Sequence, residues 1–137
     1  MENKFIEIFT GLKRDYGYAD INSAYKDPAT GKLKLKYGWA AKELLESDYL
    51  DHLTGKKSIG IQPCNDEGLA KFGAIDIDSD EYDNFDLRKY LEIIDKKNIP
   101  VVPVKSKSGG LHIYVFFKEP VKASFVRNFL DKLLFTF

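Results

Sequence analysis

The fold is decided by two short stretches, Phe72-Gly73-Ala74-Ile75-Asp76-Ile77-Asp78 and Ser108-Gly109-Gly110-Leu111-His112. In the first stretch apolar and acidic residues alternate, which predicts a strand with its isoleucines on one face and Asp76 and Asp78 on the other. Alternate side chains of a strand lie about 6–7 Å apart, so both carboxylates can reach one divalent cation. A buried strand face seldom holds two uncompensated carboxylates, and hard oxygen ligands favour Mg²⁺ or Mn²⁺. The pattern therefore predicts a metal site, whereas an exposed face would leave two ordinary surface acids.

The second stretch predicts a glycine turn that leads into a strand. Glycine amides can approach an anion closely, and the neighbouring side chains offer a hydroxyl and positive charge. The predicted nucleotide-binding residues are Lys105, Lys107, Ser108, Gly109, Gly110 and His112. If the strand that carries His112 neighbours strand 72–78, its imidazole faces the same cleft as the two aspartates. The plain alternative is a tight turn that binds nothing.

The second half of the chain predicts the order β-α-β-β-α, a ferredoxin-like (RRM-like) unit that lacks its last strand. A helix capped by Asp83 or Asn84 follows the aspartate strand. A strand at 100–105 and a strand at 111–117, ended by Pro120, come next. A closing helix carries Val126, Phe129, Leu130 and Leu133 on one face. The missing strand is expected after Phe137.

The first half predicts an αβ unit with less distinct elements. We expect a short helix that ends near Gly11 and two strands joined by a turn at 27–31. A helix at 40–53 should bury Ala41, Leu44 and Leu45, and a strand at 58–62 should pair with strand 72–78. The predicted fold class is therefore α+β, with residues 1–137 as a single domain made of an N-terminal unit, 1–70, and a second unit, 71–137.

The amino-acid composition excludes several classes of protein. Of the 137 residues 44% are hydrophobic and one is cysteine, which indicates a globular chain without an internal disulfide or a cysteine-based zinc site. No apolar run is long enough to span a membrane, so we expect a cytoplasmic protein, in the host cytoplasm if a virus encodes it. The net charge is zero, but an acidic block at 76–95 precedes a basic block at 96–137. The first block suits cations and the second suits phosphates, although solvated helix faces would look the same.

Together these residues resemble the archaeo-eukaryotic primase superfamily, and within it the primase-polymerase domains of phages, plasmids and TOTE-type conflict systems. The first motif is Ala74-Ile75-Asp76-Ile77-Asp78, and the second runs from Ser108 to Tyr114. The segment from His52 to Pro63 is similar to the part of that group that precedes the catalytic strand. The resemblance covers roughly residues 45–134.

The resemblance implies a primase-like core and a DNA-directed primase-polymerase, a nucleotidyltransferase that makes primers in DNA replication. It implies that Asp76 and Asp78 hold Mg²⁺ or Mn²⁺ on the incoming nucleotide and that His112 completes the catalytic set. Ser108 and His112 would contact the triphosphate, with Lys105 or Lys107. The implied partners are nucleoside triphosphates and a single-stranded DNA template, and further a helicase or a second primase fragment.

One departure from the family pattern leaves alternatives open. The family has a third carboxylate on a later strand, whereas only Glu119 and Asp131 follow His112, and neither position fits. The chain is then either the N-terminal part of a split primase or a degenerate relative that binds without polymerising. A non-catalytic RRM-like module is a further alternative, in which Tyr114 and Phe116 stack on bases.

Two other metal-dependent functions are poorly supported. A calcium loop could open at Asp76, but Glu81 stands where the loop needs glycine and Leu87 where it needs a bidentate glutamate. A rolling-circle nuclease would need a histidine pair beside a tyrosine, and the chain holds only His52 and His112.

Overall fold

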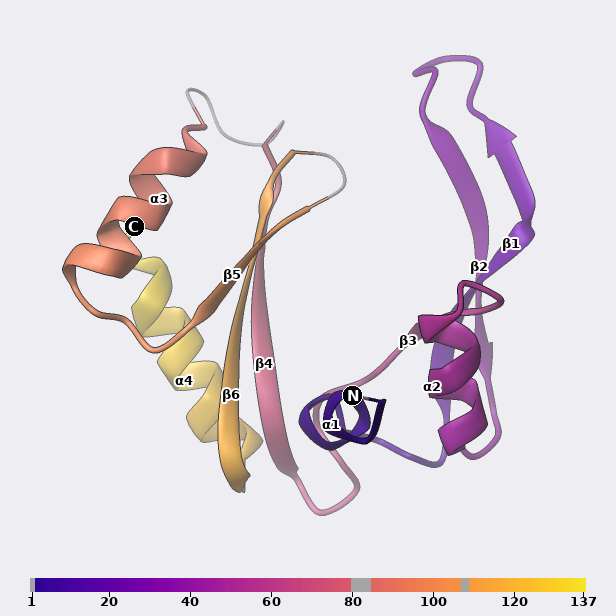
Figure 1. Cartoon of the computed structure of the whole chain (residues 1–137), viewed down its shortest axis with the longest axis horizontal. Helices are drawn as coiled ribbons and strands as arrows, with labels where there is room; N and C mark the ends of the chain where they lie inside the picture. The colour runs from indigo at the N-terminus through magenta and orange to yellow at the C-terminus, as the bar shows by residue number, and fades with distance from the viewer. Residues whose placement is uncertain (1, 80–84, 107–108) are drawn as a thin grey trace. The chain divides into compact units, whose positions relative to one another are not determined.

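The computed structural model describes residues 2–79, 85–106 and 109–137, and its chain divides into two compact units, Met1–Glu67 and Gly68–Phe137 (Figure 1). Each unit has its own antiparallel sheet and its own core. The predicted division at residue 70 lies close to this boundary. That the two units make one domain stays a prediction.

The C-terminal unit has the predicted element order, β-α-β-β-α. Its elements are β4 (Leu69–Ile77), α3 (Leu87–Lys96), β5 (Val102–Lys105), β6 (Leu111–Lys122) and α4 (Ala123–Leu134). The sheet order is β4-β6-β5, with β6 antiparallel to both neighbours. This is the split β-α-β arrangement, in which the third strand fits between the first and the second. The prediction that the strand with Asp76 and the strand with His112 are neighbours in the sheet is therefore confirmed.

Both helices of this unit cover the same face of the sheet (Figure 1). The alternation in β4 and β6 sends Ile75, Ile77 and Ile113 toward α3 and α4, where they are buried. A Cβ on Gly73 would lie 2.6 Å from Val126 of α4, so the helix packs directly on the strand backbone. Just beyond the end of α3, Asn98 adopts a left-handed conformation with φ of 48°, which stops the helix from continuing.

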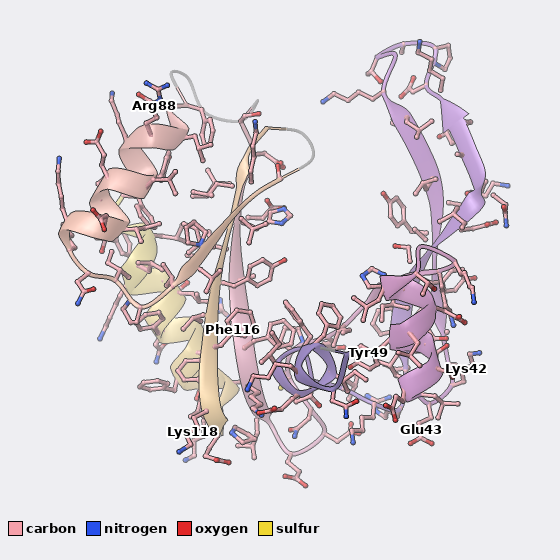
Figure 2. The ribbon with its side chains drawn as sticks, in the orientation of Figure 1. Lys42, Glu43, Tyr49, Arg88, Phe116 and Lys118 are labelled. Atoms are coloured by element: carbon pink, nitrogen blue, oxygen red, sulfur yellow. The ribbon has the colours of Figure 1, made fainter. Side chains whose placement is uncertain are left out.

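The N-terminal unit joins a three-stranded sheet to two helices. Its elements are α1 (Glu2–Ile8), β1 (Tyr16–Lys26), β2 (Leu33–Ala40), α2 (Glu46–Leu53) and β3 (Ser58–Gly60). The sheet order is β2-β1-β3, and β1 and β2 form the predicted hairpin. Tyr16, Leu44 and Tyr49 make the buried core, with Tyr49 projecting from α2 (Figure 2). The outer part of the hairpin extends past α2 and β3 (Figure 1).

A partly buried ion pair stabilises this core. The ammonium group of Lys57 contacts the Asp48 carboxylate and lies 2.7 Å from the Tyr16 hydroxyl. The backbone N–H of Leu45 donates to the other carboxylate oxygen of Asp48 at 2.9 Å, which caps the start of α2. Burial by itself raises the pKa of Asp48, but the hydrogen bonds from Lys57 and Leu45 outweigh it, so the pKa lies below its ordinary value.

Four predictions about these elements are wrong. Strand 58–62 does not pair with strand 72–78, because β3 pairs with β1 in the other sheet. The helix predicted at 40–53 begins only at Glu46, and Ala41 and Leu45 are exposed. Pro120 does not end β6, since it lies in the irregular stretch between the two paired parts of the strand, where no ladder hydrogen bond needs its N–H.

The fourth wrong prediction concerns the residue that caps the start of α3. The carboxylate of Asp86 caps this helix by accepting the backbone N–H of Arg88 at 3.0 Å. The predicted caps, Asp83 and Asn84, lie outside the described residues. In the part of the chain that the structure describes, no helix is long and apolar enough to cross a membrane.

Candidate functional site

Asp76 and His112 face each other across the sheet. They are register partners on β4 and β6, and His112 Nε2 lies 3.1 Å from Asp76 Oδ1. Alternation puts both side chains on the face that α3 and α4 leave uncovered. The Asp76 side chain is 63% exposed and the His112 side chain 37% exposed. For Asp76 the exposed-face alternative is therefore the one that holds, and its carboxylate is open to solvent.

A row of aromatic side chains continues from His112 along the same face of β6. The His112 and Tyr114 rings meet edge to face at 6.2 Å, and the Tyr114 and Phe116 rings stack at 5.9 Å with planes only 13° apart. Phe116, labelled in Figure 2, also lies beside Phe72 of β4, with ring centres 6.4 Å apart. The polar pair thus stands at one end of a strip of flat apolar surface.

The glycine turn packs tightly against the end of the aspartate strand. The backbone N–H of Ser106 donates to the Gly110 carbonyl at 2.9 Å, and Gly109 N–H donates to the Ser106 carbonyl at 3.1 Å. A Cβ on Gly110 would lie 2.2 Å from the Ile77 carbonyl oxygen, so no other residue fits there without a shift. Gly109 has a φ of 93°, which favours glycine. The turn therefore stands beside Asp78, the residue that follows β4.

The structure links the other predicted site residues less directly to the Asp76–His112 pair. Asp78 is partly buried just after β4, which ends at Ile77, and its predicted common face with Asp76 stays a prediction. Lys105 ends β5 and is exposed. Lys107 and Ser108 lie outside the described residues. Ser106, which the sequence did not single out, is buried and closes the turn. A Ser residue at the start of a Gly-Gly turn could have signalled this role.

Neither later acid joins this group. Glu119 lies far along β6 from His112, about 23 Å away at the rise of an extended strand. Asp131 lies on α4, which covers the opposite face of the sheet, and its carboxylate is 3.9 Å from Arg127 Nε. Among the described residues no group of three or more histidine, cysteine or acidic side chains is arranged to hold a metal ion. These positions agree with the prediction that neither acid is the third carboxylate of the family pattern.

These donors fit a metal that is shared with a ligand. Mg²⁺ is commonly held by one or two carboxylates plus substrate phosphates, and it keeps several waters. The exposed Asp76 carboxylate is one such ligand, Asp78 is a predicted second one, and the described residues form no closed cage. The glycine turn lies next to Asp78, with the described N–H groups of Ser106 and Gly109 donating to carbonyl oxygens of the turn itself. The arrangement suits a cation that arrives with a phosphorylated ligand.

The chain matches one known protein family. Residues 13–136 match the family described as the TOTE conflict system, Archaeo-Eukaryotic Primase domain, a match that includes every element of both units except α1. No curated protein matches the chain.

Proposed function

This chain belongs to the archaeo-eukaryotic primase domain family of TOTE conflict systems, and from that premise we propose that it binds a divalent cation and a nucleoside triphosphate for template-directed primer synthesis. The family indicates a nucleotidyltransferase-type domain; the metal, the nucleotide and the role in DNA replication belong to the proposal. The observation that carries it is the Asp76–His112 pair on an uncovered sheet face beside a glycine turn.

In the proposed mechanism Asp76 and Asp78 hold Mg²⁺ or Mn²⁺ against the triphosphate. When bound, the metal neutralises charge on the attacking and leaving oxygens of nucleotidyl transfer. His112 faces one oxygen of Asp76 through Nε2, so a contact with a phosphate oxygen would fall to its other ring nitrogen, Nδ1. The Gly110 backbone amide and the Lys105 ammonium group would meet the remaining phosphate charge, since the N–H groups of Ser106 and Gly109 donate within the turn.

The incomplete carboxylate set has a direct consequence for binding. Because the protein supplies no closed cage among the described residues, the cation and the nucleotide should bind together and each weakly alone. Titration calorimetry tests this with Mn²⁺ alone, a nucleoside triphosphate alone in EDTA, and the two together. Only the combination should give saturable binding.

Matched variants assign that binding to the site. Asp76→Asn and Asp78→Asn should each weaken cation-dependent nucleotide binding at least tenfold. Asp95→Asn is the control, because Asp95 is an exposed acid on α3, away from the sheet face. Equal binding by all three variants would contradict the proposed site.

Catalysis is tested separately, by incorporation of labelled nucleotide on a single-stranded DNA template with Mn²⁺. Product that disappears in Asp78→Asn but persists in Asp95→Asn supports a complete enzyme. Nucleotide binding without product supports the split or degenerate alternatives. Product that survives both Asp76→Asn and Asp78→Asn would refute the assigned roles.

A second candidate function rests on the stacked Tyr114 and Phe116 rings. On the uncovered face of a sheet, such rings form a platform for bases in RRM-like modules. A non-catalytic module of this kind would bind single-stranded nucleic acid without metal or nucleotide, and Tyr114→Ala would abolish that binding. The metal dependence of binding distinguishes the two functions.

A further inference from the structure

The C-terminal unit holds an open pocket on the helix-covered side of its sheet, where β4 ends. Its volume of about 710 Å³ lies within the range of about 300–1,000 Å³ that is usual for ligand pockets. The lining residues come from β4, from α3, and from α4 with the segment that follows it (Ile77, Tyr90, Asp131, Leu134, Phe135 and Phe137). Ile77 points away from the face of Asp76, because neighbouring strand residues alternate. The pocket is therefore separate from the Asp76–His112 site.

Aromatic rings form much of the wall of this pocket. The ring centre of Tyr90 lies 5.3 Å from that of Phe137, which places the end of the chain against α3 (Figure 1), and 5.4 Å from that of Phe85. Phe135 is 93% exposed and Leu134 is 47% exposed. Contiguous exposed apolar surface of this kind marks binding sites in soluble proteins. The wall thus offers both aromatic and aliphatic surface to a ligand.

The charge around the pocket favours a cationic ligand. Asp131 lines the pocket, and no basic residue among the described ones does. The Asp131 carboxylate lies 3.9 Å from Arg127 Nε, beyond hydrogen-bond distance, and both side chains are largely exposed. The segment 78–86, which joins β4 to α3, contains five acids and no lysine or arginine (Asp78, Asp80, Glu81, Asp83 and Asp86). Because these charges repel an anion, the ligand should carry positive charge.

A guanidinium group suits this combination of rings and carboxylate better than other cations. It is planar and weakly hydrated, it stacks on aromatic faces, and it donates two N–H groups to one carboxylate. A lysine ammonium group is more strongly hydrated, so placing it against rings costs more. A quaternary ammonium group has no N–H to donate to Asp131. Ile77 and Leu134 offer apolar surface to the methylene groups of an arginine and to an apolar neighbour.

We propose that this pocket binds an arginine side chain of a partner protein, in a segment where apolar residues flank the arginine. The guanidinium group lies against Tyr90 and Phe135 and pairs with Asp131, while the flanking residues cover Leu134. The pocket is a docking site in addition to the proposed nucleotide site and needs neither metal nor nucleotide. Its test is therefore made in EDTA without nucleotide.

The probe is the peptide acetyl-Leu-Arg-Leu-amide, observed through the methyl NMR signals of Ile77 and Leu134. We expect saturable shifts of both signals on titration. The matched peptide with citrulline in place of arginine has nearly the same shape but no charge. It should bind about 2- to 30-fold more weakly, the range that corresponds to loss of a cation–π contact. The matched lysine peptide should also bind more weakly than the arginine peptide.

Two variants assign the binding to the pocket. Phe135→Ala should weaken the arginine peptide about 2- to 30-fold and leave Tm unchanged, because the Phe135 side chain is almost fully exposed. Asp131→Asn should weaken the arginine peptide about two- to fivefold but leave the citrulline peptide unaffected, a difference that loss of structure would not produce.

The matched controls are Phe125→Ala and Glu119→Gln, which should both keep the parent affinity. Phe125 is a 56% exposed phenylalanine near the start of α4, and Glu119 is an exposed acid of β6. Neither residue lines the pocket. Circular dichroism checks that each variant is folded.

Absence of saturable shifts up to about 10 mM arginine peptide, which would reveal millimolar affinity, would overturn the inference. Equal affinity for the arginine and citrulline peptides would also overturn it. Free arginine that binds as tightly as the peptide would contradict a protein partner. A dimer that dissociates in Phe135→Ala, with no peptide shifts, would show that a second copy occupies the pocket and would overturn the inference as well.

The two proposals fail separately. Asp76→Asn should lose cation-dependent nucleotide binding and keep the parent affinity for the arginine peptide, because Asp76 lies on the other face of the sheet. That result would support the docking site even if the chain proves unable to polymerise. Loss of peptide binding in Phe135→Ala with normal nucleotide binding would likewise support it.

Discussion

Replacement of Gly110 by alanine tests how tightly the glycine turn is held against the aspartate strand. The new Cβ would lie 2.2 Å from the Ile77 carbonyl oxygen and 3.2 Å from Asp78 Cα, whereas real Cβ atoms essentially never approach closer than 3.0 Å. The turn must therefore retreat by about 0.8 Å from backbone atoms that are fixed by the pairing of Ile77 with Leu111. No flexible side chain can absorb this movement.

Overpacking of this kind costs about 1–3 kcal/mol. For a chain of this length the free-energy loss corresponds to a fall in Tm of about 3–12 °C. Because the displaced turn carries the Gly110 amide that we assign to phosphate binding, cation-dependent nucleotide affinity should fall at least tenfold as well. Thermal unfolding by circular dichroism and calorimetric titration with Mn²⁺ and a nucleoside triphosphate measure the two effects.

Gly60→Ala is the matched control for Gly110→Ala. The nearest atom to a Cβ on Gly60 is 3.7 Å away, which is an ordinary van der Waals contact. This variant should keep the parent Tm to within a degree or two, since only the chain entropy of the unfolded state changes. If Gly110→Ala unfolds at the same temperature as Gly60→Ala and still binds the nucleotide, the turn is not packed as described and its assigned role is wrong.

Further predictions concern the ion pair, the helix contact and the site histidine. Asp48→Asn should lower the free energy of unfolding by about 1–3 kcal/mol in urea, because it leaves the partly buried Lys57 ammonium group without its counter-ion; an equal loss in the Lys57→Met background would contradict coupling of the pair. Since the folded-state pKa of Asp48 is lowered, its contribution to folding stability should be complete above about pH 4 and should disappear as the pH falls through that lowered pKa. The pKa of Lys57 is raised in the folded state, so the contribution of Lys57 to folding stability should be complete up to about pH 10. Gly73→Ala should cost about 1–3 kcal/mol by pushing α4 away, and a second substitution that shortens Val126 should recover part of it; no recovery would refute the contact. His112→Asn should change unfolding by less than about 0.5 kcal/mol, because the pair with Asp76 is solvent-exposed, yet it should weaken nucleotide binding about tenfold; a large stability loss with intact binding would make His112 structural.

The alternation of residues in β4 and β6 made much of the C-terminal unit predictable from sequence. Period-2 patterns in these strands and one apolar stripe on each helix specify which face is buried, and the β-α-β-β-α order leaves few ways to pair the strands. The pairing of β4 with β6, and thus the meeting of Asp76 with His112, followed from that order.

The N-terminal unit was harder to predict because its signals are local and its partners are distant. Strand 58–60 is short, and nothing within it distinguishes β1 from β4 as its partner; the contact of Tyr16 with Asp48 and Lys57 ties this segment to β1. Leu45 has the apolar character of a core residue but precedes α2 as its cap, where it is exposed. A groove lined by Gly17, Trp39 and Gly60 was also missed, since these residues lie on strands far apart in the chain.

The sequence by itself determined that Asp76 and His112 meet on neighbouring strands beside the glycine turn, since their order and alternation are set by neighbouring residues, whereas the membership of Asp78 in the same group stays a prediction. Only the tertiary structure decided that Asp76 is exposed and that Gly17, Trp39 and Gly60 border one groove. The physical reason is that exposure and grooves depend on which helix covers which sheet face and on cross-strand register. Both arise from packing between segments that no local pattern specifies.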